Sequence, residues 1–155
     1  MADIVTEIDT IGDLIKPVAS FTTYYKQILP SVYVKNTFAV RWQGDNPNSD
    51  LTAVMYETER PYQVLYFGSS EIDCLQKAEK IQAELRRHIK VKLRGLDDYI
   101  TLGPVAFSSP YKTDTDGVYA MVGILTVRDI VGRPQPTWPK MQSIDATINE
   151  NGGGN

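Results

Sequence analysis

Few residues of this sequence have the type and spacing that catalysis needs. His88 is the only histidine, and it lies among Arg86, Arg87 and Lys90. These positive neighbours lower the basicity of an imidazole and repel metal cations, so we interpret His88 as a solvated residue at a helix end. A histidine-centred triad or metal site would have to use this residue, and we expect neither.

Cys74 is the single cysteine, so the chain cannot form an internal disulfide and fits a reducing compartment. A thiol near a helix N-terminus can become reactive. Because no paired cysteine or second histidine is available, we instead predict a small packing residue. The adjacent carboxylates Asp97 and Asp98 lie on a predicted turn, where neighbours point apart, which argues against an acid–base pair.

Two acid-rich loops fail as calcium sites. The loop that starts at Asn46 has Leu51 where a calcium-binding loop needs glycine, and the loop over 114–117 has Leu125 where it needs glutamate. The chain also lacks phosphate-cradling glycine motifs and the glycines of a nucleophile elbow. The sequence therefore predicts no catalytic residue, no metal ligand and no cofactor, and we expect a protein that is not an enzyme.

Composition points the same way. The 155 residues are 42% hydrophobic and 23% charged, which is ordinary for a globular domain. The formal net charge of −3 argues against a dedicated nucleic-acid-binding protein. No apolar run approaches the roughly 18 residues that span a bilayer, and the first residues form no export signal. We expect a protein made in a cytoplasm that stays soluble and binds no membrane.

Periodicity predicts the elements that would position these residues. Apolar spacing over 4–28 indicates a short helix or arm before Pro17 and a second helix after it. Strands are predicted over residues 31–42, 52–57, 62–67, 99–107 and 118–130. The charged segment 58–61 indicates a hairpin, and polar loops are expected over 43–50 and 110–117. The last strand is apolar on both faces, so we expect it to be central.

The strongest local pattern predicts a long helix from Ser69 or Ser70 to about Lys90. Ser70 and Asp73 have the spacing of a capping box, and cations gather in the last turn. The predicted apolar face consists of Ile72, Leu75, Ala78, Ile81, Leu85 and Ile89.

These elements define an α+β fold. We expect a single mixed or antiparallel sheet of about five strands, packed with an N-terminal helix and one long amphipathic helix over residues 1–132. Residues 133–155 have three prolines near their start and a glycine-rich end, which predicts an extended arm with a flexible tip.

Two features suggest contact surfaces. The long helix and its exit carry a cluster of cations, Lys77, Lys80, Arg86, Arg87, Lys90, Lys92 and Arg94. The cluster is either a solvated face supported by pairs such as Glu84–His88, or a strip that meets an acidic partner or a neighbouring subunit. In the arm, Trp138 and Met141 either anchor a neighbouring subunit or fold back over their own sheet. The predicted interface residues are Trp138, Met141, Arg86, Arg87 and Lys90.

The chain resembles the tail terminator, or tail completion, proteins of long-tailed bacteriophages and phage-like particles. The residues that carry the resemblance are 28–33 (Ile-Leu-Pro-Ser-Val-Tyr), 62–68 (Tyr-Gln-Val-Leu-Tyr-Phe-Gly) running directly into the long helix, and 128–130 (Arg-Asp-Ile). The resemblance covers roughly residues 25–132 and rests on element order and texture. The 43–50 loop and the proline-rich extension lie outside this family core.

The resemblance implies a homo-oligomeric ring, commonly a hexamer, at the head–tail junction, or neck, of a virion. Such a ring would sit on the last ring of tail tube protein, stop tube polymerisation and present the surface that joins the head connector or stopper. A sheath protein would be a further partner in a contractile tail, and DNA would only pass through the pore.

Three alternatives remain open from the sequence. The first is a head–tail stopper or another minor neck protein. The second is a small ligand-binding domain, which would need a pocket with convergent polar groups. The third is a nucleic-acid-binding protein that uses the basic helix, whose DNA binding would be salt-sensitive.

Overall fold

The fold is described from a computed structural model that covers residues 3–134, the side chains of 46–49 excepted. The described residues form two helices, α1 (Ile4–Ala19) and α2 (Glu71–Arg87), and one sheet of eight strands. The strands are β1 (Thr23–Lys26), β2 (Thr37–Trp42), β3 (Asn46–Asp50), β4 (Met55–Gly68), β5 (Lys90–Lys92), β6 (Tyr99–Phe107), β7 (Tyr111–Lys112) and β8 (Tyr119–Gly132).

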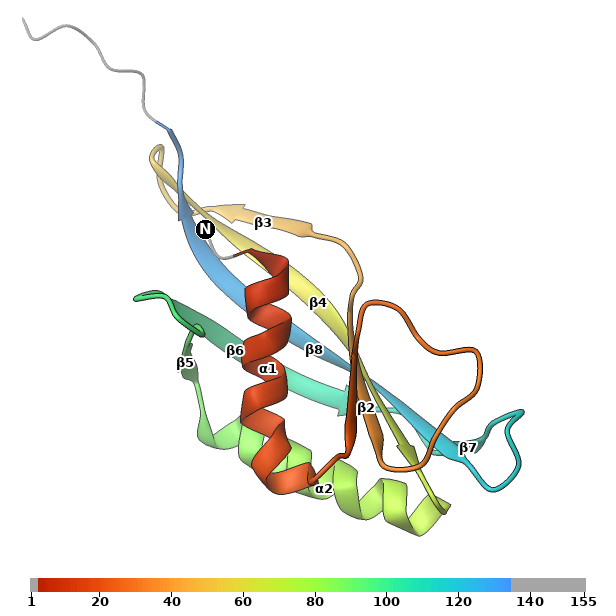
Figure 1. The fold of residues 1–155 in the computed structure, drawn as a ribbon. Coiled ribbons are helices and arrows are strands. Elements are labelled where there is room, and N and C mark those ends of the chain that lie inside the picture. Colours follow the sequence, from red (N-terminus) through yellow and green to blue (C-terminus); the bar gives the residue numbers. More distant parts are fainter. Residues whose placement is uncertain (1–2, 135–155) are drawn as a thin grey trace, which may run out of the picture.

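The predicted α+β class is confirmed, but the sheet is larger than the five strands expected. The main strand order is β1-β2-β4-β8-β6-β5, with β3 added to β4 and β7 added to β8. Only the β1–β2 pair is parallel among the described strands. Both helices lie on the same face of the curved sheet (Figure 1).

The longest pairing joins β4 to β8, antiparallel and in register from Met55–Gly132 to Gly68–Tyr119. The prediction of a central last strand is confirmed, because β8 lies between β4 and β6. The predicted hairpin at 58–61 is wrong, since β4 runs through it without a break. Pro61 is tolerated because it lies between the part of β4 that pairs with β3 and the part that pairs with β2.

The N-terminal prediction needs two corrections. Pro17 lies in the last turn of α1 and does not split it, and no second helix follows. Ser20 ends α1 in the left-handed conformation, with φ of 49°, and the chain then forms β1. The strand predicted over 31–42 begins only at Thr37, after a loop over 27–36. The loop predicted over 43–50 contains β3, which pairs with β4.

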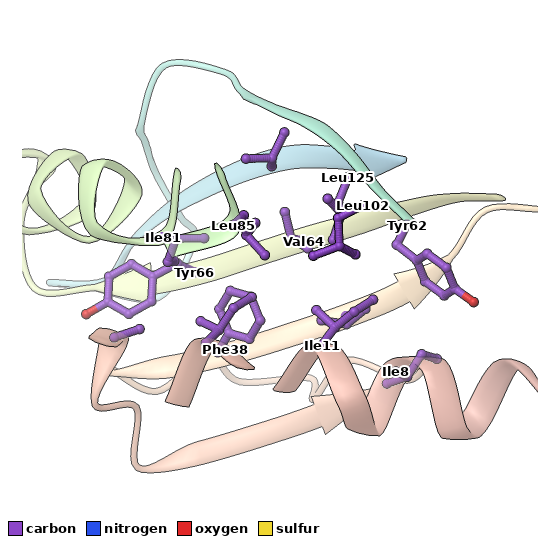
Figure 2. Packing of buried hydrophobic residues seen from close by; sticks show 14 of the residues in the cluster. Ile8, Ile11, Phe38, Tyr62, Val64, Tyr66, Ile81, Leu85, Leu102 and Leu125 are labelled. Carbon is purple, nitrogen blue, oxygen red and sulfur yellow. The ribbon is translucent and has the colours of Figure 1, made fainter. Parts of the chain in front are cut away.

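The main core lies between the helices and one face of the sheet (Figure 2). Alternate residues of β4 point into it, from Tyr62 through Val64 to Tyr66, and each is at most 1% exposed. Helix α1 contributes Ile8 and Ile11, and α2 contributes Ile81 and Leu85, among other residues. A smaller cluster on the opposite face consists of Ala39, Leu65, Phe67, Val118 and Ala120.

The predicted helix over 69–90 is confirmed in type and start. Ser70 is the N-cap, and its Oγ accepts a hydrogen bond from the Asp73 N–H at 3.1 Å. The capping box is displaced by one residue, because the Asp73 carboxylate accepts from the N–H of Ser69 at 3.2 Å and not from that of Ser70.

Gly12 in the middle of α1 makes room for an aromatic ring. A Cβ at this position would lie 2.6 Å from the Tyr24 ring. That ring is held in place because its hydroxyl donates to the Ile8 carbonyl at 2.6 Å and its face stacks with Phe21 and Phe38. The glycine therefore lets β1 approach α1 closely.

We expect Gly12→Ala to lower the free energy of unfolding by about 1–3 kcal/mol, because the added methyl group displaces a fixed ring. Helix propensity alone predicts the opposite, a gain of about 1 kcal/mol. Urea denaturation measures the difference. Gly132→Ala is the control, since a Cβ there has open space around it. A Gly12→Ala variant as stable as the wild type would contradict the proposed packing.

Candidate assembly surfaces and a buried charge network

A charge network lies buried between α1 and the sheet. Arg60 of β4 is 1% exposed, and its Nη1 lies 2.5 Å from Oε1 of the fully buried Glu7. The hydroxyl of Tyr62 donates to the other oxygen of Glu7. The Nε of Arg60 donates to Oδ1 of Asp45 at 3.1 Å. The network ties the first turns of α1 to the centre of β4 and to the segment before β3.

Burial sets the protonation behaviour of this network. Loss of solvent raises the pKa of Glu7, against the opposing effects of the Tyr62 hydrogen bond and the Arg60 charge. Burial also raises the pKa of Asp129 on β8, and Asp98 adds to this rise. Because Glu7 has no exposed surface, it has no access to a substrate. We interpret the network as a tie that holds α1 on the sheet.

The sequence analysis missed this network. Arg60 lies in the charged segment 58–61 that was predicted to be a hairpin, and no motif singled out Glu7. Their pairing joins positions 53 residues apart, and no local pattern indicates it.

The residues considered for catalysis are spread over the described structure. Cys74 is buried, with its Sγ 3.7 Å from the Tyr119 carbonyl oxygen, which confirms the packing role. Burial raises the pKa of this thiol to about 11. His88 is half-exposed at the C-cap of α2, with Nε2 2.9 Å from Oε1 of Glu84, so the predicted Glu84–His88 pair is confirmed.

Asp97 and Asp98 do not form a carboxylate pair directed at one point. Asp97 is almost fully exposed and pairs with Lys92, whereas Asp98 accepts a hydrogen bond from the N–H of Tyr99. In the part of the chain that the structure describes, no three histidine, cysteine or acidic side chains are grouped closely enough to hold a metal ion. Over the same residues, no helix is long and apolar enough to cross a membrane.

A surface hollow of about 260 Å³ lies between α1 and β5. Two of its lining residues are charged partners, because the Nε of Arg94 donates to Oδ2 of Asp13 at 2.6 Å. These polar groups are directed at each other across the opening and not at a common point inside it. The hollow therefore lacks the convergent polar groups of a ligand site.

The face of the sheet opposite the helices is only partly covered. The 27–36 loop covers one end, where Tyr33 stacks on Phe67 with ring centroids 4.5 Å apart. Beyond the loop, Ile124 and Ile130 of β8 are exposed. The loop itself presents exposed apolar side chains, Ile28, Val32 and Val34.

The hairpin tip between β3 and β4, residues 51–55, is a second apolar surface. Leu51, Val54 and Met55 are exposed there. The tip has a defined shape, because the N–H groups of Val54 and Met55 both donate to Oγ1 of Thr52, at 3.2 and 3.0 Å. The N–H of Arg133 donates to the Val54 carbonyl at 2.8 Å, which fixes the end of β8 beside the tip.

The outer face of α2 is a third surface, and it corrects the predicted helix orientation. Ile72, Leu75 and Ile89 were expected in the core, but they are 67%, 54% and 73% exposed. Ala78, Ile81 and Leu85 are buried as predicted, and Cys74 is buried together with them. The buried stripe is therefore rotated toward Cys74, so Ile72 and Leu75 face outward from α2, and Ile89 is exposed just beyond its end.

Of the predicted interface residues, three lie within the described structure. Arg86 and Lys90 are exposed, and Arg87 is exposed with its Nη1 3.4 Å from Oε2 of Glu84. All three occupy the C-terminal end of α2 and the start of β5, so the structure brings them together. Trp138 and Met141 lie outside the described residues, as does most of the predicted arm over 133–155.

Comparison with known proteins assigns the chain to no family. No known family profile matches the chain, and no curated protein matches it. Among solved structures, one similar chain belongs to "Virion of native gene transfer agent (GTA) particle". The two chains are 13% identical, and the match covers 82% of this chain and 85% of that chain with a TM-score of 0.37. A likeness of this size carries no argument about function.

We expect the buried carboxyl of Glu7 to make stability depend on pH. Because its pKa is raised in the folded state, the folded chain keeps a proton that the unfolded chain loses above about pH 4.5. The free energy of unfolding therefore falls as the pH rises through this window. Glu7→Gln keeps a hydrogen-bonding side chain but removes the titration, so its stability should fall less over the same range.

Urea denaturation between pH 4 and pH 8 measures both curves. Glu79→Gln removes an exposed acid of α2 and provides the matched control. Parallel curves for the wild type and Glu7→Gln would show that Glu7 does not titrate in this window.

Proposed function

We propose that this chain is a non-enzymatic structural subunit of a phage or phage-like virion, and that its copies close into a ring on the end of the tail tube. The observation that carries the proposal is the presence of different exposed apolar surfaces at opposite ends of the β4–β8 pair. The hairpin tip, which carries Leu51, Val54 and Met55, adjoins the start of β4, and the start of α2, which carries Ile72 and Leu75, adjoins its other end (Figure 1). Exposed apolar groups of this kind mark protein contact sites.

The length of β4 separates the two surfaces. Fourteen residues at about 3.4 Å each extend roughly 45 Å. A molecule with two different surfaces so far apart can bind a tube subunit at the hairpin tip and a neighbouring copy at the start of α2. Contacts between unlike patches generate rings when the rotation closes, which is the assembly that a tail terminator needs.

The proposed mechanism is shape-matched binding. One surface of the ring would bind the last ring of tail tube protein, and the other would not match a further tube subunit, so tube growth would stop. The new top surface would then join the head connector or stopper at the neck of the virion. The sequence resemblance over residues 25–132 supports this assignment. The charge network of the described residues is buried, so it does not form an open reactive centre.

The hairpin tip provides the first test. We expect the double variant Val54→Ser, Met55→Ser to weaken tube capping at least about tenfold, because two apolar contact side chains are lost. The measurement is the length distribution of tail tubes grown from tube protein with each variant present, seen by electron microscopy. Leu96→Ser is a matched control, since Leu96 is 44% exposed and Val54 and Met55 are 43% and 40% exposed.

The partner distinguishes the two roles in the neck. Wild-type protein that forms a ring on tubes and fixes their length supports the terminator, whereas protein that binds only the portal adaptor supports a head–tail stopper. Protein that binds neither and leaves tube length unchanged would contradict the proposal.

A further inference from the structure

The outer face of α2 carries a stripe of residues that nothing in the described structure covers. At 100° per residue, the positions Glu71, Ile72, Leu75, Glu79, Gln82, Ala83 and Arg86 fall within about a third of the helix circumference. All of these positions are exposed except Gln82, which is half-buried. A shallow hollow lies beside the middle of the stripe and is lined by Gln76, Glu79, Lys80 and Ala83.

The two halves of this stripe carry opposite charge. Glu71 and Glu79 are exposed in the N-terminal half and form no ion pair with any described residue. The nearby cation Lys77 is engaged elsewhere, because its Nζ donates to the Ala19 carbonyl at 2.7 Å. The N-terminal half of the stripe is therefore acidic and apolar at once, and the exposed Lys80 lies beside Glu79, outside the stripe.

The C-terminal half and the start of β5 are basic. Arg86 and Lys90 are exposed and likewise lack an ion pair within the described residues. Glu84, the acid of this half, is occupied by Arg87 and His88. Ile89 is the most exposed large apolar side chain of this region, and it lies between Arg86 and Lys90 in the sequence.

The helix dipole alone does not account for this distribution. The dipole favours acids in the first turn and cations in the last turn, which covers Glu71 and Arg86. Glu79 lies more than two turns after the start of α2, and Lys90 lies beyond its end. Nor does the dipole explain why Ile72, Leu75 and Ile89 are exposed.

We propose that the acidic, apolar N-terminal half of the α2 stripe binds the basic C-terminal end of α2 in a second copy of the chain. Glu79 and Glu71 then face Lys90 and Arg86 of the neighbouring copy, and Ile72 and Leu75 pack against its Ile89. The contact rests on the proposed ring function and specifies which surfaces join the copies. Charge complementarity between the two halves identifies the occupant as this same chain.

In the proposed ring, this contact is head-to-tail. The 17 residues of the helix extend about 25 Å, so the two halves present separate surfaces. Each copy uses its acidic half toward one neighbour and its basic end toward the other. In a head-to-tail dimer, one copy keeps an unused acidic half and the other keeps an unused basic end. A closed ring uses all of these surfaces.

Charge reversal tests the contact. Glu79→Lys and Lys90→Glu each place like charges opposite each other and should weaken self-association at least about tenfold, measured by sedimentation in low salt. The double variant Glu79→Lys, Lys90→Glu restores opposite charges and should recover self-association to within about threefold of the wild type. An equimolar mixture of the two single variants should also recover it.

Two controls separate the contact from an effect of net charge or folding. Lys35→Glu makes the same charge change on the 27–36 loop, on the other face of the sheet, and should leave self-association unchanged. Circular dichroism of every variant checks that the fold is intact. Single reversals without effect, or a double variant as weak as the single ones, would overturn the proposed pairing.

A zero-length carbodiimide cross-link supplies an independent readout, because it joins an amine only to a carboxylate in contact with it. A mixture of isotope-labelled and unlabelled wild-type chains should give intermolecular links from Lys90 to Glu79 or Glu71. Lys90→Arg should lose the link but keep self-association. Absence of these links from the wild-type mixture would overturn the contact.

The same variants in the tube-length assay keep the two proposals distinguishable. Wild-type protein that caps tubes, together with charge-reversed variants that cap equally well, leaves the ring function standing and removes the α2 contact. Wild-type protein that self-associates and cross-links through α2 but does not cap tubes removes the tail function and leaves the contact standing.

Discussion

The antiparallel pairing of β4 with β8 is the constraint on which the rest of the structure depends. It runs over fourteen residues of each strand and places every alternate side chain of both strands on the helix side of the sheet. The same pairing fixes where the hairpin tip and the start of α2 lie, because each adjoins one end of β4. The exposed apolar surfaces are therefore held at a set separation by backbone hydrogen bonds.

The helices add a second constraint, because both pack on one face. Glu7 and Arg60 hold α1 over the centre of β4, and Gly12 lets Tyr24 of β1 lie against the same helix. Within residues 3–134, this arrangement leaves the other face of the sheet to be covered mainly by the 27–36 loop. A protein with one covered and one partly open sheet face has surface to spare for partners, which fits the proposed role in assembly.

Sequence patterns predicted the long, regular elements well. The cap at Ser70, the helix that follows it and the central strand β8 all have strong local signals, and the structure confirms them. The short edge strands β1, β5 and β7 have two to four residues each, too few for alternation to appear. The prediction of a hairpin at 58–61 was wrong, because Arg60 is buried in an ion pair with Glu7, which is distant in sequence. No local pattern indicates this pairing.

The candidate surfaces were predicted only in part. The cation cluster indicated Arg86 and Lys90 directly, because charge is visible in a sequence. The exposure of Ile72 and Leu75 was not predicted, since α2 has two overlapping apolar stripes and periodicity cannot tell which one meets the sheet. The stripe that is buried contains the small side chains of Cys74 and Ala78, which let the helix approach the strands closely.

The hydrogen bond from Arg133 to Val54 has a mechanical consequence. Tension applied along the axis of β8 loads the rungs of the β4–β8 ladder in shear. Rungs loaded in shear share the force and must break together, whereas rungs peeled from one end break one at a time. The β4–β8 ladder therefore resists tension along this axis.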